Sequence, residues 1–253
     1  MTAPAYDLIA ADAPSRWVVT CDHASNRIPC GVAGGDLGLP PADMGRHIAY
    51  DVGAAGVARH LARLLDAPAV LSNFSRLVID PNRGEDDPTL LMRVYDGTVI
   101  PANRDADGAE RARRLAAYHR PYHDALTALL AGRADPVICA IHSFTPRLRG
   151  RAPRPWQVGV LFAEDRRLAD PLIARLRTEP DLAVGVNEPY SGALPGDAMD
   201  RHGLAMGRLH VLIELRNDLI SDWEGQAAWA ARLAPHLQAA LRDAEEGGHG
   251  SSD

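Results

Sequence analysis

Short apolar runs alternate with longer segments of helical spacing along most of the chain. The apolar runs, which we expect to be buried strands, are Trp17–Cys21, Ala69–Leu71, Leu77–Ile79, Val137–Ile141, Val158–Phe162 and Leu209–Leu215. The segments of helical spacing run from about Asp43 to Leu65, from Ala109 to Ala131, from Arg166 to Arg177 and from Asp222 to Arg242. Strands that alternate with helices predict an α/β fold with a largely parallel sheet.

Two polar segments interrupt this pattern. The segment from Asp80 to about Asp107 is rich in Pro, Gly, Asn and Asp, and loops of this length in compact domains are usually functional or disordered. Residues 245–253 are rich in Gly and Ser, so we expect a disordered tail. No linker divides the rest, so we expect residues 1–253 to form a single domain, which is long enough for a substantial core.

Composition narrows the expected partners. The formal net charge is −6, which gives no support to nucleic-acid binding, because that requires a basic face. No apolar run approaches the roughly 18 residues needed to cross a bilayer, and the first residues lack the basic start and apolar core of a secretory signal. Cys21, Cys30 and Cys139 do not form a disulfide framework, so we expect a cytoplasmic protein.

Three polar residues stand at the ends of predicted strands: His23, His142 and Glu214. The carboxyl ends of strands in an open α/β sheet meet at one crevice, so these side chains can converge although they are far apart in sequence. Two imidazoles suit a zinc-type ion with an open position for water, and a carboxylate beside it can act as general base. Alternatively, each His bonds a loop, and Glu214 forms an ion pair with Arg216.

Six motifs occur in a defined order between Trp17 and Leu241. They are CDHASNRIP (21–29), GRHIAYDVGA (45–54), SRLVIDPNR (75–83), IHSFTP (141–146), NEPYSG (187–192) and LIELRNDLI (212–220). Together they resemble the N-formylglutamate amidohydrolase family, which is similar to zinc carboxypeptidases and aspartoacylases. The resemblance implies a three-layer sandwich with a mostly parallel mixed sheet. It also implies one zinc ion per chain and removal of a formyl group from the amino nitrogen of glutamate.

The resemblance also implies roles for individual residues. His23 and His142 match the two metal-binding histidines, and Glu214 matches the general base of the similar carboxypeptidase segment. The pair Asn82 and Arg83 resembles an Asn-Arg pair that binds a substrate carboxylate. Tyr190 resembles a mobile tyrosine on the substrate side.

The third metal ligand is where the chain departs from the carboxypeptidase pattern. Carboxypeptidases have a Glu three residues after the first His, and this chain has Asn26 there. Asp51 is an alternative if its helix begins at the crevice, and Asp22 is another. We favour Asp51 over Asn26 because a carboxylate better completes a zinc site.

The implied substrate is a small anion with two carboxylates, which arginine binds well through two parallel hydrogen bonds. Candidate arginines in or beside the long loop are Arg76, Arg83, Arg93 and Arg104. We expect Arg83 first and Arg76 second, although surface arginines are commonly only solvated. An arginine beside the scissile carbonyl can also stabilise an oxyanion, which gives Arg83 a possible catalytic role. His202 and Arg216 are further candidates.

His119 and His123 have the spacing of two ligands on one helix face, but the Glu of metalloproteases is missing between them and Pro121 disrupts a helix. We expect a packing or supporting role for His123. We expect a monomer or small homo-oligomer that binds neither membrane nor nucleic acid. Alternative functions are hydrolysis of another N-acyl or cyclic amide or a small peptide, non-catalytic binding on the same fold, and metal-free α/β chemistry on a carbohydrate or nucleotide.

Overall fold

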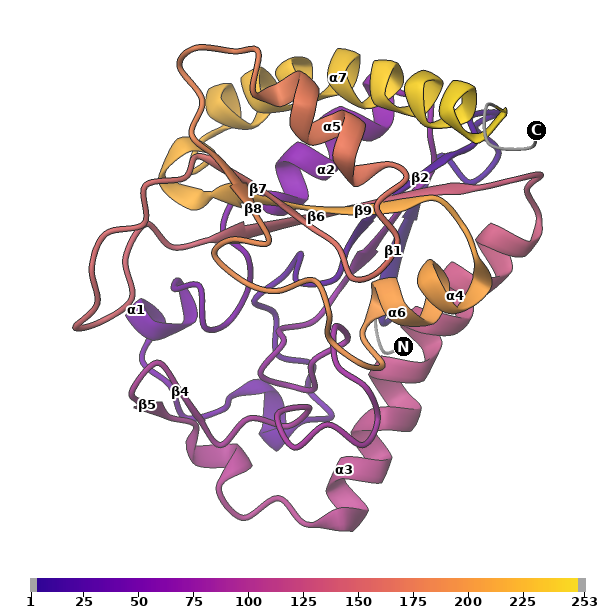
Figure 1. Cartoon of the computed structure of the whole chain (residues 1–253). Coiled ribbons are helices and arrows are strands. Elements are labelled where there is room, and N and C mark those ends of the chain that lie inside the picture. The colour runs from indigo at the N-terminus through magenta and orange to yellow at the C-terminus, as the bar shows by residue number, and fades with distance from the viewer. Residues whose placement is uncertain (1–3, 250–253) are drawn as a thin grey trace.

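A seven-stranded mixed sheet forms the centre of the computed structural model, which describes residues 4–249 (Figure 1). The strand order is β1-β3-β2-β6-β9-β7-β8. The strands are β1 (Tyr6–Ile9), β2 (Trp17–Cys21), β3 (Ala69–Ser72), β6 (Val137–Phe144), β7 (Val158–Leu161), β8 (Val184–Val186) and β9 (His210–Arg216). Strands β3, β2, β6 and β9 are mutually parallel, whereas β1 and the β7–β8 pair run the other way. The prediction of a mostly parallel mixed sheet is confirmed.

Helices cover both faces of this sheet and make three layers (Figure 1). Helices α2 (Ala54–Leu64), α5 (Ala169–Leu176) and α7 (Trp223–His249) share one hydrophobic cluster with one face. Helices α4 (Arg120–Ala131) and α6 (Ala198–His202) share another with the opposite face. Side chains alternate along a strand, so β6 sends Cys139 and Ile141 toward α2 and α7, and Ile138 and Ala140 toward α4. By the same alternation His142, in β6, lies on the α4 side.

The long polar segment after residue 80 is ordered and packed. It holds the hairpin of β4 (Val94–Tyr95) and β5 (Thr98–Val99) and the 3₁₀ turn Pro101–Asn103. Leu90 and Ile100 are fully buried in a third hydrophobic cluster beneath it. The remaining helical pieces are the 3₁₀ turns Ala33–Gly35, Leu204–Met206 and Asn217–Leu219 and the short helices α1 (Pro41–Met44) and α3 (Gly108–Arg114).

The helix expected from Asp43 to Leu65 is shorter than predicted. Helix α2 begins only at Ala54, and the segment between α1 and α2 is a turn. Gly53 marks the break, because its φ of +81° is left-handed and a Cβ there would lie 2.0 Å from the carbonyl oxygen of Ile220. Asp51 is therefore in a loop next to the sheet edge and not on the helix.

Two other predictions are corrected. The apolar run Leu77–Ile79 is a buried turn, because it packs beneath the loop and pairs with no strand in the described part of the chain. The tail was expected to be disordered from Glu245, but α7 continues to His249. The rest of that predicted tail, residues 250–253, lies outside the described residues.

The helix expected from Ala109 to Ala131 is present, but it is not uniform. A π-helical turn, Leu115–His119, joins α3 to α4. Pro121 follows at the start of α4, and because proline has no N–H to donate, the widened turn accommodates it without ending the helix. Among residues 4–249 we find no helix with both the length and the apolar character that crossing a bilayer demands.

Candidate metal centre and active site

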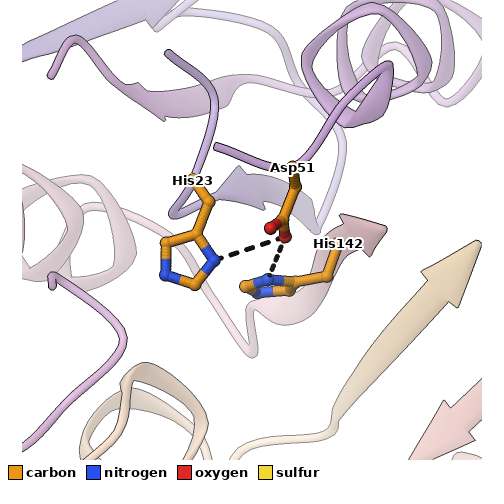
Figure 2. Close-up of side chains that lie close together, drawn as sticks. All are labelled: His23, Asp51 and His142. Carbon is orange, nitrogen blue, oxygen red and sulfur yellow. Dashed lines mark hydrogen bonds and ion pairs between the residues drawn. The ribbon is translucent and has the colours of Figure 1, made fainter. Parts of the chain in front are cut away.

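His23, Asp51 and His142 meet at the carboxyl ends of the parallel strands (Figure 2). His23 follows β2, Asp51 precedes α2 and His142 lies in β6. Asp51 Oδ2 is 3.3 Å from His23 Nδ1 and 2.9 Å from His142 Nδ1. One nitrogen or oxygen atom from each residue lies within 4.8 Å of the other two, and all three side chains are buried.

Backbone hydrogen bonds hold the Asp51 loop in this position. The Asp51 amide donates to the carbonyl of His23 at 2.9 Å, and the Ser143 amide donates to Asp51 Oδ2 at 3.2 Å. The loop is thus attached to the strand ends that carry both histidines. Asn26 is not at this centre: it is exposed, and its side-chain amide donates to the carbonyl of Met44.

A second carboxylate faces the far nitrogen of each imidazole. Asp80 Oδ1 is 2.7 Å from His23 Nε2, and Asp22 Oδ2 is 3.2 Å from His142 Nε2. Such partners orient the rings of metal-binding histidines and raise their basicity. Sequence reasoning missed Asp80 and considered Asp22 only as a ligand. The sequence signal for Asp80 was its position directly after the apolar run Leu77–Ile79. A carboxylate that is buried at such a position needs a partner.

The charge of this centre fits a divalent cation. Burial alone would raise the pKa values of Asp22, Asp51 and Asp80, but the neighbouring histidines and, for Asp80, chiefly the Arg76 guanidinium lower all three. When both imidazoles are neutral, as metal binding requires, the carboxylates of Asp22, Asp51 and Asp80 and the Arg76 guanidinium leave a net charge of about −2. Buried charge requires compensation, and two imidazole nitrogens with one carboxylate oxygen form a typical donor set for a catalytic zinc-type ion.

Glu214 lies beside this centre. It is on β9, opposite His142 in the register of the parallel pair β6–β9. The side chain is buried, and its Oε2 has no hydrogen-bond partner among the residues that the structure describes. Burial raises the pKa of Glu214 to about 7, although the His142 imidazole opposes this shift. The alternative ion pair is not formed, because Arg216 pairs with Asp218 at 2.8 Å.

A cavity of about 280 Å³ opens from the centre toward the predicted substrate residues. Asn82, Arg83 and Tyr190 line it as expected. Arg83 donates to Thr89 Oγ1 and to the carbonyl of Asn82, and it forms no ion pair within the described residues. Arg76 also lines the cavity, but its guanidinium is 2.7 Å from Asp80 and 3.5 Å from Asp51, so it stabilises the metal-side carboxylates.

Other predicted residues lie away from the cavity. Arg104 is exposed at the end of a 3₁₀ turn, and Arg93 is exposed and bonded to the carbonyl of Ala106. His202 is packed against His123 behind the cavity wall. Charge and loop position could not distinguish Arg104 from Arg83, because they do not tell which side of a loop faces the cavity.

The cavity also contains residues that the sequence did not single out, among them His47, Tyr95 and Asp197. Asp197 caps α6 by accepting a hydrogen bond from the Asp200 amide, and burial raises its pKa to about 6. Tyr190 stacks against Arg154, whose guanidinium also donates to the tyrosine oxygen at 3.1 Å. Burial raises the pKa of Tyr190 to about 12, so its hydroxyl keeps its proton at neutral pH.

Two imidazoles, an aspartate and a buried glutamate at the carboxyl ends of a mixed α/β sheet form the site of a hydrolase. The family is given by the sequence: residues 15–221 match the model of the N-formylglutamate amidohydrolase family, and the chain belongs to that family. The predicted resemblance is therefore confirmed. No curated protein was found to match the chain.

Solved structures agree with this membership. A gene product of Agrobacterium tumefaciens is 36% identical with a TM-score of 0.90, over 96% of this chain and 97% of that one. An N-formylglutamate amidohydrolase from Ralstonia eutropha JMP134 is 23% identical with a TM-score of 0.68, over 98% of this chain and 100% of that one. At this lower identity the likeness shows a shared fold.

Proposed function

We propose that this protein is a zinc-dependent amidohydrolase that converts N-formyl-L-glutamate to formate and L-glutamate. The observation that carries the proposal is Glu214, a buried carboxylate beside His23, Asp51 and His142 whose Oε2 has no hydrogen-bond partner within residues 4–249. Family membership supports the reaction class. As an alternative within that class, the substrate is another small N-acyl amino acid.

His23, Asp51 and His142 would hold the zinc ion. When bound, zinc supplies Lewis-acid chemistry that polarises an amide carbonyl and acidifies water. Glu214 accepts the proton that water loses as it attacks the carbonyl, and then gives this proton to the leaving nitrogen as the amide bond breaks. Burial raises the pKa of Glu214, which makes it a stronger base than an exposed carboxylate.

Arg83 and Asn82 bind a substrate carboxylate in this proposal. The Arg83 guanidinium lines the cavity without a carboxylate partner in the described part of the chain, so it is available to an anionic ligand. Arg83 also has a possible second role as oxyanion stabiliser. The two roles differ kinetically: lost ground-state binding raises KM, whereas a lost oxyanion contact lowers kcat.

The proposal is tested by metal analysis together with an assay on N-formyl-L-glutamate before and after chelation. We expect about one zinc per chain, hydrolysis of the substrate, loss of activity with chelator and recovery with zinc. Less than about 0.1 metal per chain, without rescue by added zinc, would contradict the metal site. Metal binding without hydrolysis of any N-acyl amino acid would favour a non-catalytic binding protein.

A specific observation favours adding larger N-acyl amino acids to the assay. A second, largely apolar pocket of about 160 Å³ shares Leu161, Leu194 and Leu212 with the catalytic cavity. An apolar cavity of about 150 Å³ is large enough for benzene. If N-acyl amino acids that carry an apolar group of about this size have a higher kcat/KM than N-formyl-L-glutamate, the true substrate belongs to this bulkier class.

A further inference from the structure

Three buried histidines lie against the loop that carries Asn82 and Arg83. His119 ends the π-helical turn, His123 is on α4 and His202 ends α6. His119 Nε2 is 3.0 Å from the carbonyl oxygen of Arg83, and His123 Nε2 is 2.9 Å from that of Pro81. His202 Nε2 is 2.8 Å from His123 Nδ1. We call these three residues the histidine cluster.

The hydrogen bonds define the protonation of the cluster. A carbonyl oxygen only accepts, so Nε2 of His119 and of His123 must each carry a proton. In a neutral His123 the Nδ1 atom is then an acceptor, and His202 Nε2–H donates to it. Burial, together with the nearby Arg201 charge, lowers the pKa of all three rings, which keeps them neutral. The cluster therefore acts as a set of hydrogen-bond donors.

The widened π turn brings two of these donors together. The rings of His119 and His123 lie 4.4 Å apart, and the rings of His123 and His202 are stacked at 5.1 Å. His119 and His123 consequently reach two carbonyls that flank Asn82. π-Helical turns are rare and occur frequently at functional sites.

Further contacts hold the same loop. The side-chain Oδ1 of Asn82 accepts a hydrogen bond from the Ala198 backbone amide at 3.2 Å. The backbone amide of Asn82 donates to Asp80 Oδ1 at 2.9 Å. Gly84 and Gly196 are in close backbone contact, because a Cβ on Gly196 would lie 2.8 Å from Gly84 Cα. The loop is thus held both by the histidine cluster and by the segment that leads into α6.

We propose that the histidine cluster positions Asn82 and Arg83 and thereby sets the affinity of the site for the substrate carboxylate. This inference rests on the proposed function of Arg83. The histidines do not line the catalytic cavity, so they act through the loop. The HRPYH motif (His119–His123), which has the spacing of a metal site, is here a support for substrate binding.

The test compares His119→Ala with His119→Gln, which keeps a donor near the Nε2 position. We expect His119→Ala to raise KM for N-formyl-L-glutamate about tenfold while kcat changes less than about twofold. His119→Gln should restore much of the KM. In an Arg83→Ala background His119→Ala should raise KM no further, because the two act through one contact. Additive effects would overturn the proposal.

His236→Gln is the matched control, because His236 lies on α7, across the sheet from the cluster, bonds Glu179 and lines neither the catalytic cavity nor the second pocket. If His119→Ala does not fold, His202→Leu tests the same histidine cluster and should also raise KM. A lower melting temperature with unchanged KM would show a merely structural role and overturn the proposal.

A second measurement does not depend on activity. Hydrogen exchange of residues 80–86 should be faster in His119→Ala than in wild type and His236→Gln, since the loop loses one anchor. If wild type hydrolyses no N-acyl amino acid, the proposed function fails, yet faster exchange would still show that the cluster holds the loop. Unchanged exchange would overturn the positioning role itself.

Discussion

Two groups of buried histidines lie on the same side of the sheet, and their surroundings differ completely. His23 and His142 face the carboxylates of Asp22, Asp51 and Asp80. Burial alone would lower the pKa of His142, but hydrogen bonds to two carboxylates raise it well above its ordinary value. The centre attracts positive charge, and a divalent cation meets that need.

The histidine cluster shows the opposite behaviour. His123 is as buried as His142, but it faces the Pro81 carbonyl, two other imidazoles and the charge of Arg201. Its pKa is lowered well below the ordinary value. The comparison teaches that burial does not decide the role of a histidine. Carboxylate neighbours favour a cation, whereas carbonyl and arginine neighbours favour a neutral donor.

The largest effect is expected when Asp51, whose carboxylate faces both His23 and His142, is replaced. Asp51→Asn should weaken zinc binding by about a hundredfold or more, because a structural zinc site with four protein ligands is worth roughly 10–16 kcal/mol, or about 3 kcal/mol per ligand. Competition with a chelator of known affinity measures this loss. His210→Gln, outside the centre, should bind zinc as the wild type does. Unchanged affinity in Asp51→Asn would remove Asp51 from the ligand set.

Glu214→Gln should separate metal binding from proton transfer. We expect zinc content to stay near the wild-type level while kcat falls about a hundredfold or more, as general-base contributions do. Metal analysis and steady-state kinetics on the same preparation test this. Activity that survives the change would show that another group accepts the proton.

The neutral cluster predicts a loss of stability in acid. Burial and the charges of Arg201 and Arg208 lower the pKa of His202 from 6.5 to about 4, although Asp22 opposes them. The unfolded chain therefore binds a proton below pH 6.5 that the folded chain binds only near pH 4. The free energy of unfolding should fall across this window, by about 2 kcal/mol at pH 5 relative to pH 7.

Urea unfolding at pH 7 and pH 5 measures this effect. His202→Leu should remove the part of this pH dependence of the free energy of unfolding that comes from His202. The part that comes from His123, in the same cluster, should remain. An identical pH dependence in wild type and His202→Leu would show that His202 is not held neutral by its surroundings.

The smallest effect is expected for Asp80, which orients the metal ligand His23 and is not itself a ligand in this proposal. Asp80→Asn keeps the shape of the side chain beside His23 but loses its charge, and should weaken zinc binding about tenfold. Asp165→Asn is a matched control, because Asp165 is a partly buried carboxylate that pairs with Arg167 far from the metal residues. Equal zinc affinities in the two variants would argue against the supporting role of Asp80.

The sequence predicted the central strands well because buried parallel strands are nearly continuous apolar runs. It also predicted that His23, His142 and Glu214 converge, because parallel strands share a carboxyl edge. Apolar spacing could not locate the start of α2, since the break at Gly53 comes from a backbone contact with Ile220. Such contacts are long-range and have no local pattern.

The sequence also could not show which atoms the buried polar side chains contact. Asp80 reaches His23 across 57 positions, and His123 reaches a carbonyl 42 positions away. A carbonyl has no sequence signature, so the spacing of His119 and His123 indicated only a helix face. The same limit explains why Arg83 and Arg104 looked alike in the sequence.

The position of β9 has a consequence for synthesis of the protein. β9 (His210–Arg216) is the last strand within residues 4–249, yet it lies between β6 and β7. Strand β6 can pair with β2 earlier, but β7 and β8 cannot join the sheet until residues 210–216 have left the ribosome. Glu214 arrives with this strand, so a nascent chain can gather His23, Asp51 and His142 but cannot complete the catalytic centre before β9 has been made and has joined the sheet.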